Sequence, residues 1–592
     1  MRKHLVAVLA AVVLLPSMVG AQTAPPNPVT TAPSKFNEMT VAQLQALMAS
    51  GELSSVNLTN FYISRILQLD QNGPGVNAVI ELNPDAVAMA READRLRGKG
   101  TVLGPLHGVP VLLKDNIDTG DRMQTSAGSL ALVGQPAVRD STVAANLRAG
   151  GAVILGKTNL SEWANFRSFE SISGWSGRGG QTHNPCGIDR NPCGSSSGSG
   201  AAASSNFAAV SLGSETDGSI VCPANANGVV GIKPTVGLTS RAGVVPLSHT
   251  QDTVGPHGRT VADAAATLGV IQSRTFDGRD AATGGVPLGW QGTSKTRPTN
   301  IPTDYTKFVN PKGLSGATLG LTRAGLKGFD PNVPTPQPVL DAFEEAVAAL
   351  TTAGAKVVDL DAAGFTFASA DGELLVLLFD FRNDVRAYFA TRAGVPVAGG
   401  NLQTAIDFNT AHAADEMPFF NQDIFDLANS LAPGPDDPQP AFGGMTYNQA
   451  LAIDHNAGVN GIDAAISQFK LDAVVSATDN PAWATDLLYG DHFIFGTSGL
   501  AAGPGYPIVQ VPAGMVFGVP LGISFFGTAF SEQTLIKLAS GFEATTQVRA
   551  KNLPTFSPTV PFNKIQGTTV VRPKPGAPAT PPDTHRRMPH GV

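Results

Sequence analysis

The chain has 592 residues, of which 42% are hydrophobic and 15% are charged. A chain of this length buries enough surface to fold without help from disulfides or a structural metal. Its 40 lysines and arginines against 47 aspartates and glutamates give a net charge of −7. Because no basic stripe stands out in the sequence, we expect no nucleic-acid partner.

The N-terminus has the pattern of a secretory signal. Arg2 and Lys3 precede an apolar run at 5–15, and Val19-Gly20-Ala21 supplies small residues for cleavage before Gln22. The apolar run is too short to span a bilayer. We therefore expect a signal peptide at 1–21, a secreted or periplasmic protein, and no membrane span after cleavage.

Predicted elements follow in chain order as helices, then strands alternating with helices. Helices are predicted from Thr40, with a capping signal, and at about 56–69, 84–97, 138–150, 447–469 and 532–545. Short apolar runs predict strands at 109–113, 152–155, 208–212, 471–476, 508–511 and 522–526. This alternation predicts an α/β fold with a largely buried central sheet.

The remaining stretches suggest how the chain is divided. Residues 22–37 are predicted to form a flexible lead-in and 563–592 a proline-rich disordered tail, which leaves one large domain at 38–562. Within that domain, 273–312 and 394–445 lack clean periodicity and are rich in Gly, Pro and Asp. They are predicted to be surface insertions.

Three cysteines are too few for a disulfide framework or a zinc motif. Export would permit a Cys186–Cys193 disulfide, but three unpaired thiols, with Cys222 the third, fit the sequence equally well. No metal motif is visible in the sequence. We therefore expect neither a metal nor a cofactor.

The chemistry concentrates in two segments rich in small residues, 194–200 and 213–220, which flank a predicted buried strand. Gly194-Ser195-Ser196-Ser197-Gly198 fits the G-x-S-x-G nucleophile elbow with Ser196 at its centre. A turn precedes it where the elbow needs a strand, and no later histidine lies in a partner motif. Phosphate binding by the glycine-rich loop is weaker still, because neither nucleotide fingerprint is present.

These segments also resemble the amidase signature family. Gly194-Ser195-Ser196 is followed by Gly218-Ser219-Ile220, and the lysine strand of that family is matched at 108–115, which includes Lys114. Further matches at 126–129, 228–235, 252–256 and 505–507 extend the resemblance over roughly 38–556. It implies a single large domain, a mixed central β-sheet covered by helices on both faces, and hydrolysis of amide bonds.

The resemblance implies a Ser-Ser-Lys triad in which Ser219 is the nucleophile, Ser195 bridges and Lys114 is the base. The chemistry is coherent, because a serine needs a base to attack and burial keeps a lysine neutral. The backbone N–H groups of Thr216, Asp217, Gly218 and Ser219 would then stabilise the oxyanion. Asp217 replaces a glycine common in the family, and its carboxylate is expected to point away from the oxyanion.

Lys157 and Lys233 are rival bases. Lys157 follows a predicted strand as Lys114 does, so local sequence does not separate the two. Lys233 precedes a proline and is predicted to be structural.

The blocks 163–168, 175–179 and 213–239 resemble bacterial peptide amidases, which remove the C-terminal amide of peptides. Val221 stands where many family members carry arginine. The alternative substrates are aryl or fatty acyl amides, with esterase side activity. A catalytically silent binding protein is disfavoured, because all three catalytic positions are filled. The expected partner is thus a peptide or small-molecule amide, and the sequence leaves the oligomeric state open.

Overall fold

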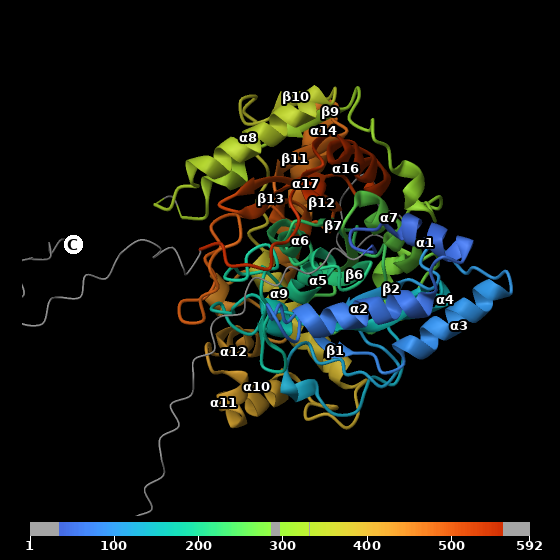
Figure 1. Cartoon of the computed structure of the whole chain (residues 1–592). Helices are drawn as coiled ribbons and strands as arrows, with labels where there is room; N and C mark the ends of the chain where they lie inside the picture. The colour runs from blue at the N-terminus through green and yellow to red at the C-terminus, as the bar shows by residue number, and fades with distance from the viewer. Residues whose placement is uncertain (1–34, 286–296, 331, 561–592) are drawn as a thin grey trace, which may run out of the picture.

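The computed structural model describes residues 35–285, 297–330 and 332–560 (Figure 1). The predicted signal peptide, most of the predicted lead-in and the predicted tail lie outside these ranges. Within them, no helix combines the length and the apolar character needed to cross a membrane.

The fold is built on one long sheet of eleven strands in the order β1-β3-β2-β6-β8-β7-β12-β13-β11-β9-β10. A short hairpin of β4 and β5 lies apart from this sheet. The strands are β1 (Val79–Leu82), β2 (Pro110–Lys114), β3 (Val153–Thr158), β4 (Trp175–Ser176), β5 (Gly180–Gln181), β6 (Val210–Glu215), β7 (Val230–Lys233), β8 (Thr253–Gly258), β9 (Thr318–Leu321), β10 (Lys356–Asp359), β11 (Ala473–Ala477), β12 (Ile508–Val516) and β13 (Val519–Phe526).

The sheet is mixed. Strands β3, β2 and β6 run parallel, as do β11, β9 and β10, whereas every pairing from β6 through β8, β7, β12 and β13 to β11 is antiparallel. Every residue of β2, β3, β6, β8 and β13 is buried. Since successive side chains point to opposite faces, both faces of these strands are covered. The predicted α/β fold with a mixed, covered sheet is confirmed.

Helices surround the sheet, and most of the predicted ones are present (Figure 1). They are α1 (Val41–Ser50), α2 (Ser55–Leu69), α3 (Ala86–Gly98), α4 (Thr142–Ala149), α5 (Ser197–Ser204), α6 (Val221–Asn227), α7 (Val261–Ile271), α8 (Gln337–Thr352), α9 (Glu373–Phe389), α10 (Leu402–Ala411), α11 (Ala413–Glu416), α12 (Asp423–Ser430), α13 (Tyr447–Gly458), α14 (Ala464–Phe469), α15 (Gly499–Ala502), α16 (Glu532–Thr546) and α17 (Val548–Lys551). The predicted capping signal at Thr40 is a complete capping box with Gln43.

Two large hydrophobic clusters lie along the sheet. The first is built around β2, β3 and β6 with α2, α4 and α5. The second is built around β9, β11, β12 and β13 with α7, α8 and α16. The two clusters adjoin at α6, which packs against both α5 and the strands β12 and β13.

The segment 394–445 forms α10, α11 and α12, of which α10 and α12 pack against α9 in a third hydrophobic cluster. Arg167 and Glu416 fasten this segment to the rest of the domain. Arg167 donates to the carbonyls of Phe420 and Asn421, and the Glu416 carboxylate accepts from the N–H of Leu130. The other predicted insertion is 273–312, and its residues 286–296 lie outside the described ranges.

Candidate active site

Lys114 ends β2 and is completely buried. Its Nζ donates to Ser195 Oγ at 2.7 Å, to Ser214 Oγ at 3.0 Å and to the Ser214 carbonyl at 3.2 Å. Asn116 donates to the same Ser214 hydroxyl at 2.9 Å. The amine is therefore held in a fixed position against the Ser195 hydroxyl.

Burial sets the protonation state of this lysine. It lowers the pKa of Lys114 to about 7, although the carboxylates of Asp252 and Glu215 act in the opposite direction. A large fraction of the amine is then neutral near neutral pH. A neutral amine in contact with a hydroxyl can accept its proton.

Ser195 lies in the loop that leads into α5. The Gly194–Ser195 peptide bond is cis. A β-carbon on Gly194 would lie 2.2 Å from Ser161 Oγ and 2.5 Å from Asn165 Oδ1, so only glycine fits before the serine. The Ser195 carbonyl accepts from the Ser161 N–H at 3.0 Å, which fixes the backbone on its other side.

Ser219 lies just before α6 and is 8% exposed. Its carbonyl accepts from the Ser196 N–H at 3.2 Å, which joins the two serine segments directly. Gly218 before it has a φ of +77°, a conformation that favours glycine. The structure thus brings together Lys114, Ser195 and the segment of Ser219, which come from three separate stretches of sequence.

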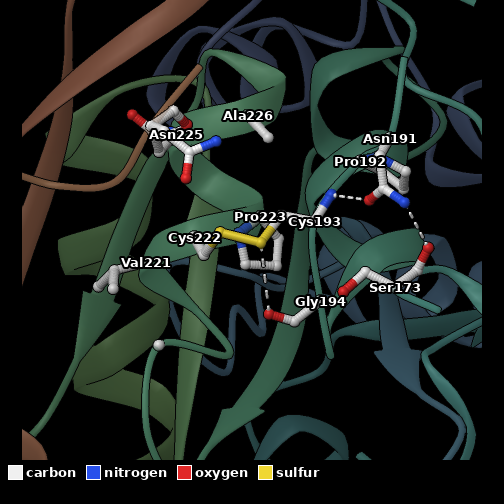
Figure 2. The surroundings of a disulfide bond; sticks show 12 residues. Ser173, Asn191, Pro192, Cys193, Gly194, Val221, Cys222, Pro223, Asn225 and Ala226 are labelled. Carbon is white, nitrogen blue, oxygen red and sulfur yellow. Dashed lines mark hydrogen bonds between the residues drawn. A yellow bond between two sulfur atoms is a disulfide. The ribbon is translucent and has the colours of Figure 1, made fainter. Parts of the chain in front are cut away.

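A disulfide ties the same two segments together (Figure 2). Cys193, two residues before Ser195, is bonded to Cys222, three residues after Ser219, with their Cα atoms 5.9 Å apart. Both sequence-based options, a Cys186–Cys193 disulfide and three free thiols, are wrong. The sequence could not place Cys222 beside Cys193, because 29 residues and a buried strand separate them; Cys186 remains a buried free thiol.

Glu215 is a site residue whose role is not visible in the sequence. Its carboxylate accepts from the N–H groups of Gly218 at 3.1 Å, Ile220 at 2.7 Å and Val221 at 3.0 Å. These bonds satisfy the open N–H groups at the start of α6 and favour a negative charge there. The only sequence signal was its position inside the block 213–220.

This arrangement changes the expected oxyanion site. The Gly218 N–H is directed at Glu215, which differs from the prediction that it faces the oxyanion. The N–H groups of Thr216, Asp217 and Ser219 have no acceptor among the residues that the structure describes. They are the donors left for a substrate oxygen.

The Asp217 side chain reaches the start of α15. Its Oδ2 lies 3.6 Å from the β-carbon position of Gly499. Burial raises the pKa of the Asp217 carboxyl, which weakens its negative charge near the nucleophile.

Asp252 supports the segment 213–220, which carries Ser219, through a hydrogen bond with Thr216. Its carboxylate accepts from Thr216 Oγ1 at 2.6 Å and from the N–H groups of Leu247 and Ser248 at 2.8 and 3.0 Å. Burial raises the pKa of Asp252 to about 6, so the group is mostly ionised at neutral pH. It begins the block 252–256, which was the one sequence signal for it.

The rival lysines are both buried but contact no serine of the site. Lys157 Nζ donates to the carbonyls of Ile117 and Gln124 and to Thr125 Oγ1 at 2.7, 3.0 and 2.9 Å, which occupies all of its protons if it is charged. Lys233 Nζ donates to the Tyr506 carbonyl at 2.7 Å. Their contacts make both lysines structural.

The nucleophile-elbow alternative has no support in the geometry. Ser196 Oγ donates to the Ser214 carbonyl at 3.0 Å and accepts from the Ser214 N–H at 3.2 Å. His257 contacts the Ile220 carbonyl at 3.0 Å. Within the described ranges, no histidine hydrogen bonds to Ser195, Ser196 or Ser219.

Comparisons with known proteins agree with this geometry. A family model described as Amidase matches residues 57–415. A probable amidase of Arabidopsis thaliana is 40% identical over 521 residues, which cover 87% of this chain and 91% of that protein. The solved structure of a peptide amidase from Stenotrophomonas maltophilia is 44% identical, covers 88% of this chain and 100% of that one, and has a TM-score of 0.77. A peptide amidase called PAM, solved with the competitive inhibitor chymostatin, is 45% identical, covers 88% and 99% of the two chains, and also has a TM-score of 0.77.

Proposed function

Because this chain belongs to the amidase signature family and is an amide hydrolase, we propose that it is an exported enzyme that removes the C-terminal amide of peptides through an acyl-enzyme on Ser219. The observation that carries the mechanism is the 2.7 Å contact between the Ser195 hydroxyl and the buried Lys114 amine, whose pKa is lowered to about 7. Through that contact, the neutral Lys114 amine can accept the proton of the Ser195 hydroxyl.

Acylation runs through these groups in order. Neutral Lys114 takes the proton of Ser195, and Ser195 takes the proton of Ser219 as Ser219 Oγ attacks the amide carbon. The N–H groups of Thr216, Asp217 and Ser219 receive the oxyanion, while Glu215 holds the loop that carries them.

Collapse of the tetrahedral intermediate breaks the C–N bond. The Ser195 proton passes to the leaving nitrogen, and Lys114 returns its proton to Ser195. Water then attacks the acyl-enzyme by the same route, and the products are ammonia and a free carboxylate.

The peptide-amide assignment is supported by likeness to the two peptide amidases, which extends over most of this chain. Val221 begins α6 and is packed in the hydrophobic cluster of β12 and β13. Where many relatives carry arginine, this site therefore offers no positive charge, which suits a substrate whose reacting end is a neutral carboxamide.

Export is supported by the pattern at 1–21 and by the Cys193–Cys222 disulfide. Structural disulfides form and persist in oxidising compartments such as the periplasm or the extracellular space. We therefore propose a secreted or periplasmic location. N-terminal sequencing of the protein from the culture medium and the periplasm should begin at Gln22, and a chain found only in the cytoplasm with Met1 intact would contradict export.

The function is tested with a fluorophosphonate probe and a substrate panel. The probe should label Ser219, as mapped by mass spectrometry, and Ser219→Ala should abolish both labelling and turnover. Ser199→Ala is the matched control, because it removes a buried serine hydroxyl of α5 that donates to the Leu212 carbonyl, away from Ser219. Unlabelled, folded wild-type protein would overturn the mechanism.

The panel compares peptide amides with acyl anilides, fatty amides and short aliphatic amides. Peptide amides should give the highest kcat/KM, and the product mass should rise by one unit as –CONH₂ becomes –COOH. A labelled enzyme that prefers anilides or fatty amides would overturn the substrate assignment while leaving the triad intact.

A further inference from the structure

Asn191 lies just before the serine-rich segment 194–200 and is completely buried. Its Oδ1 accepts from the Cys193 N–H at 2.7 Å, and its Nδ2 donates to the Ser173 carbonyl at 2.9 Å (Figure 2). The second amide proton is directed at the Asp491 carboxylate, whose Oδ1 lies 3.3 Å from Nδ2. Both donors and the acceptor of this amide are therefore used, which fixes its orientation.

Asp491, from the loop between β11 and α15, holds this arrangement in place. Both of its carboxylate oxygens lie 3.1 Å from the Ser173 nitrogen, so the carboxylate accepts from the Ser173 N–H as well as from Asn191. Burial raises the pKa of Asp491 to about 6, and the group is still mostly ionised at neutral pH. In the described part of the chain, it forms no hydrogen bond with a member of the triad.

The contact with Asn191 supports an unfavourable backbone conformation. Cys193 has a φ of +58°, in the left-handed region that residues other than glycine seldom adopt. Its carbonyl accepts from Ser197 Oγ at 2.6 Å, so side chains hold both of its backbone groups. Ser195 follows two residues later, and the position of its hydroxyl against Lys114 depends on where this segment lies.

The loop that carries Asp491 is itself packed against this segment. The Asn191 N–H donates to the Trp483 carbonyl of that loop at 2.7 Å. Trp483 also packs with Cys193 and Cys222 in a small hydrophobic cluster. The Asp491 carboxylate therefore acts from a support that is joined to the active-site segments.

We propose that Asn191 is a positioning residue for hydrolysis and that Asp491 holds it. The pair keeps the Cys193 N–H in its contact, and the Ser195 hydroxyl thereby stays 2.7 Å from the Lys114 amine. The inference rests on the proposed role of Ser195 as the proton relay. Release of the segment should slow proton transfer, because a displacement of about 1 Å at reacting groups can cost about 100-fold in rate.

The first test compares Asn191→Ala with the wild type. The rate at which a fluorophosphonate labels Ser219, and kcat for the best amide of the substrate panel, should each fall about 10- to 100-fold. KM should change much less than kcat, because the substitution releases the segment of Ser195 and not the substrate. Circular dichroism verifies that each variant is folded.

Asn83→Ala is the matched control. Asn83 is also buried, its Oδ1 accepts from the Asp85 N–H two residues later at 2.8 Å, and its Nδ2 donates to the Ile154 carbonyl at 2.7 Å. Because Asn83 lies beside α3, this variant should lose melting temperature as Asn191→Ala does but keep wild-type labelling and kcat. Equal labelling rates in the two variants would make Asn191 structural only and overturn the proposal.

The second test exchanges the two members of the pair. Asn191→Asp places a carboxylate against Asp491, so labelling should slow at least as much as in Asn191→Ala. Adding Asp491→Asn removes the repulsion and supplies a new amide donor, so the double variant should be about tenfold faster than Asn191→Asp. If it is no faster, Asp491 does not hold Asn191 and the proposal is wrong.

The wild type separates this inference from the function on which it rests. Unlabelled wild-type protein would refute the Ser-Ser-Lys triad and this proposal together. A labelled wild type with Asn191→Ala and Asn191→Asp at the same rate would refute the positioning role alone.

Discussion

Removing the Cys193–Cys222 disulfide is expected to reduce both stability and turnover. The perturbation is the double variant Cys193→Ala, Cys222→Ala. The bond closes a loop of 29 residues, and the entropy that it removes from the unfolded chain corresponds to about 3.6 kcal/mol at 25 °C. For a folded region of roughly 500 residues, that free energy lowers the melting temperature by about 3 °C.

Turnover should fall as well, because the bond lies within three residues of both catalytic serines. The assay compares melting temperature, kcat and KM for the wild type and the double variant, each with and without dithiothreitol. Reductant should lower the melting temperature and kcat of the wild type toward those of the double variant. It should leave both quantities unchanged in the double variant. The kcat should fall more than KM rises, since the bond positions reacting groups and is not expected to contact the substrate.

Cys186→Ala is the control, because it removes a buried thiol and leaves the disulfide intact. It should keep wild-type kcat and wild-type sensitivity to reductant. The reasoning is refuted if the double variant melts within 1 °C of the wild type, or if it retains full kcat.

The other predictions concern the triad and its electrostatics. Activity should rise with pH through about 7, because Lys114 acts as a base only after it loses its proton; a flat kcat/KM profile from pH 5 to 9 would contradict this. Asp252→Asn removes a charge that raises the pKa of Lys114, so the acidic limb of the same profile should move to lower pH; a shift to higher pH would contradict the assignment. Lys114→Met should reduce kcat by at least about 10³-fold, measured by ammonia release, with little change in folding. Lys157→Met should instead destabilise the protein by about 3 kcal/mol, because it leaves the buried carbonyls of Ile117 and Gln124 without a donor. An unchanged melting temperature together with a lost kcat would show that Lys157, and not Lys114, is the base.

The helices and strands that can be predicted from the sequence are those with a local signal in their own residues, such as an apolar run or a helix cap. Strand β2 is a continuous apolar run, and α1 starts at a capping box that can be identified from Thr40 and Gln43. Strand β8, by contrast, contains Gly255, Pro256 and Gly258, which resemble a turn. It is a strand because β6 and β7 pair with it on both sides, and that pairing is tertiary.

Helix α9 is not predicted from the sequence, because its hydrophobic residues show no helical period. Its residues from Leu375 to Phe381 are all buried, so its N-terminal half has no polar face to produce a helical period. The segment 394–445 lacks a clear pattern because its helices are short, and α10 and α12 are stabilised mainly by packing on α9.

At the site, the serines and Lys114 could be predicted because they lie in ordered motifs. The disulfide, the caps made by Glu215 and the support from Asp252 could not, because each joins segments that meet only in the folded chain.

The position of the site between two hydrophobic clusters affects when the enzyme can first act. Lys114 and Ser195 are carried by elements of the cluster around β2, whereas Ser219 precedes α6, which packs on β12 and β13. Those two strands span 508–526, almost at the end of the domain. Until β12 and β13 are made, α6 can pack only on α5 and β7, which precede them in the chain. We therefore expect a product truncated before residue 508 to hold Ser219 loosely and to hydrolyse little substrate.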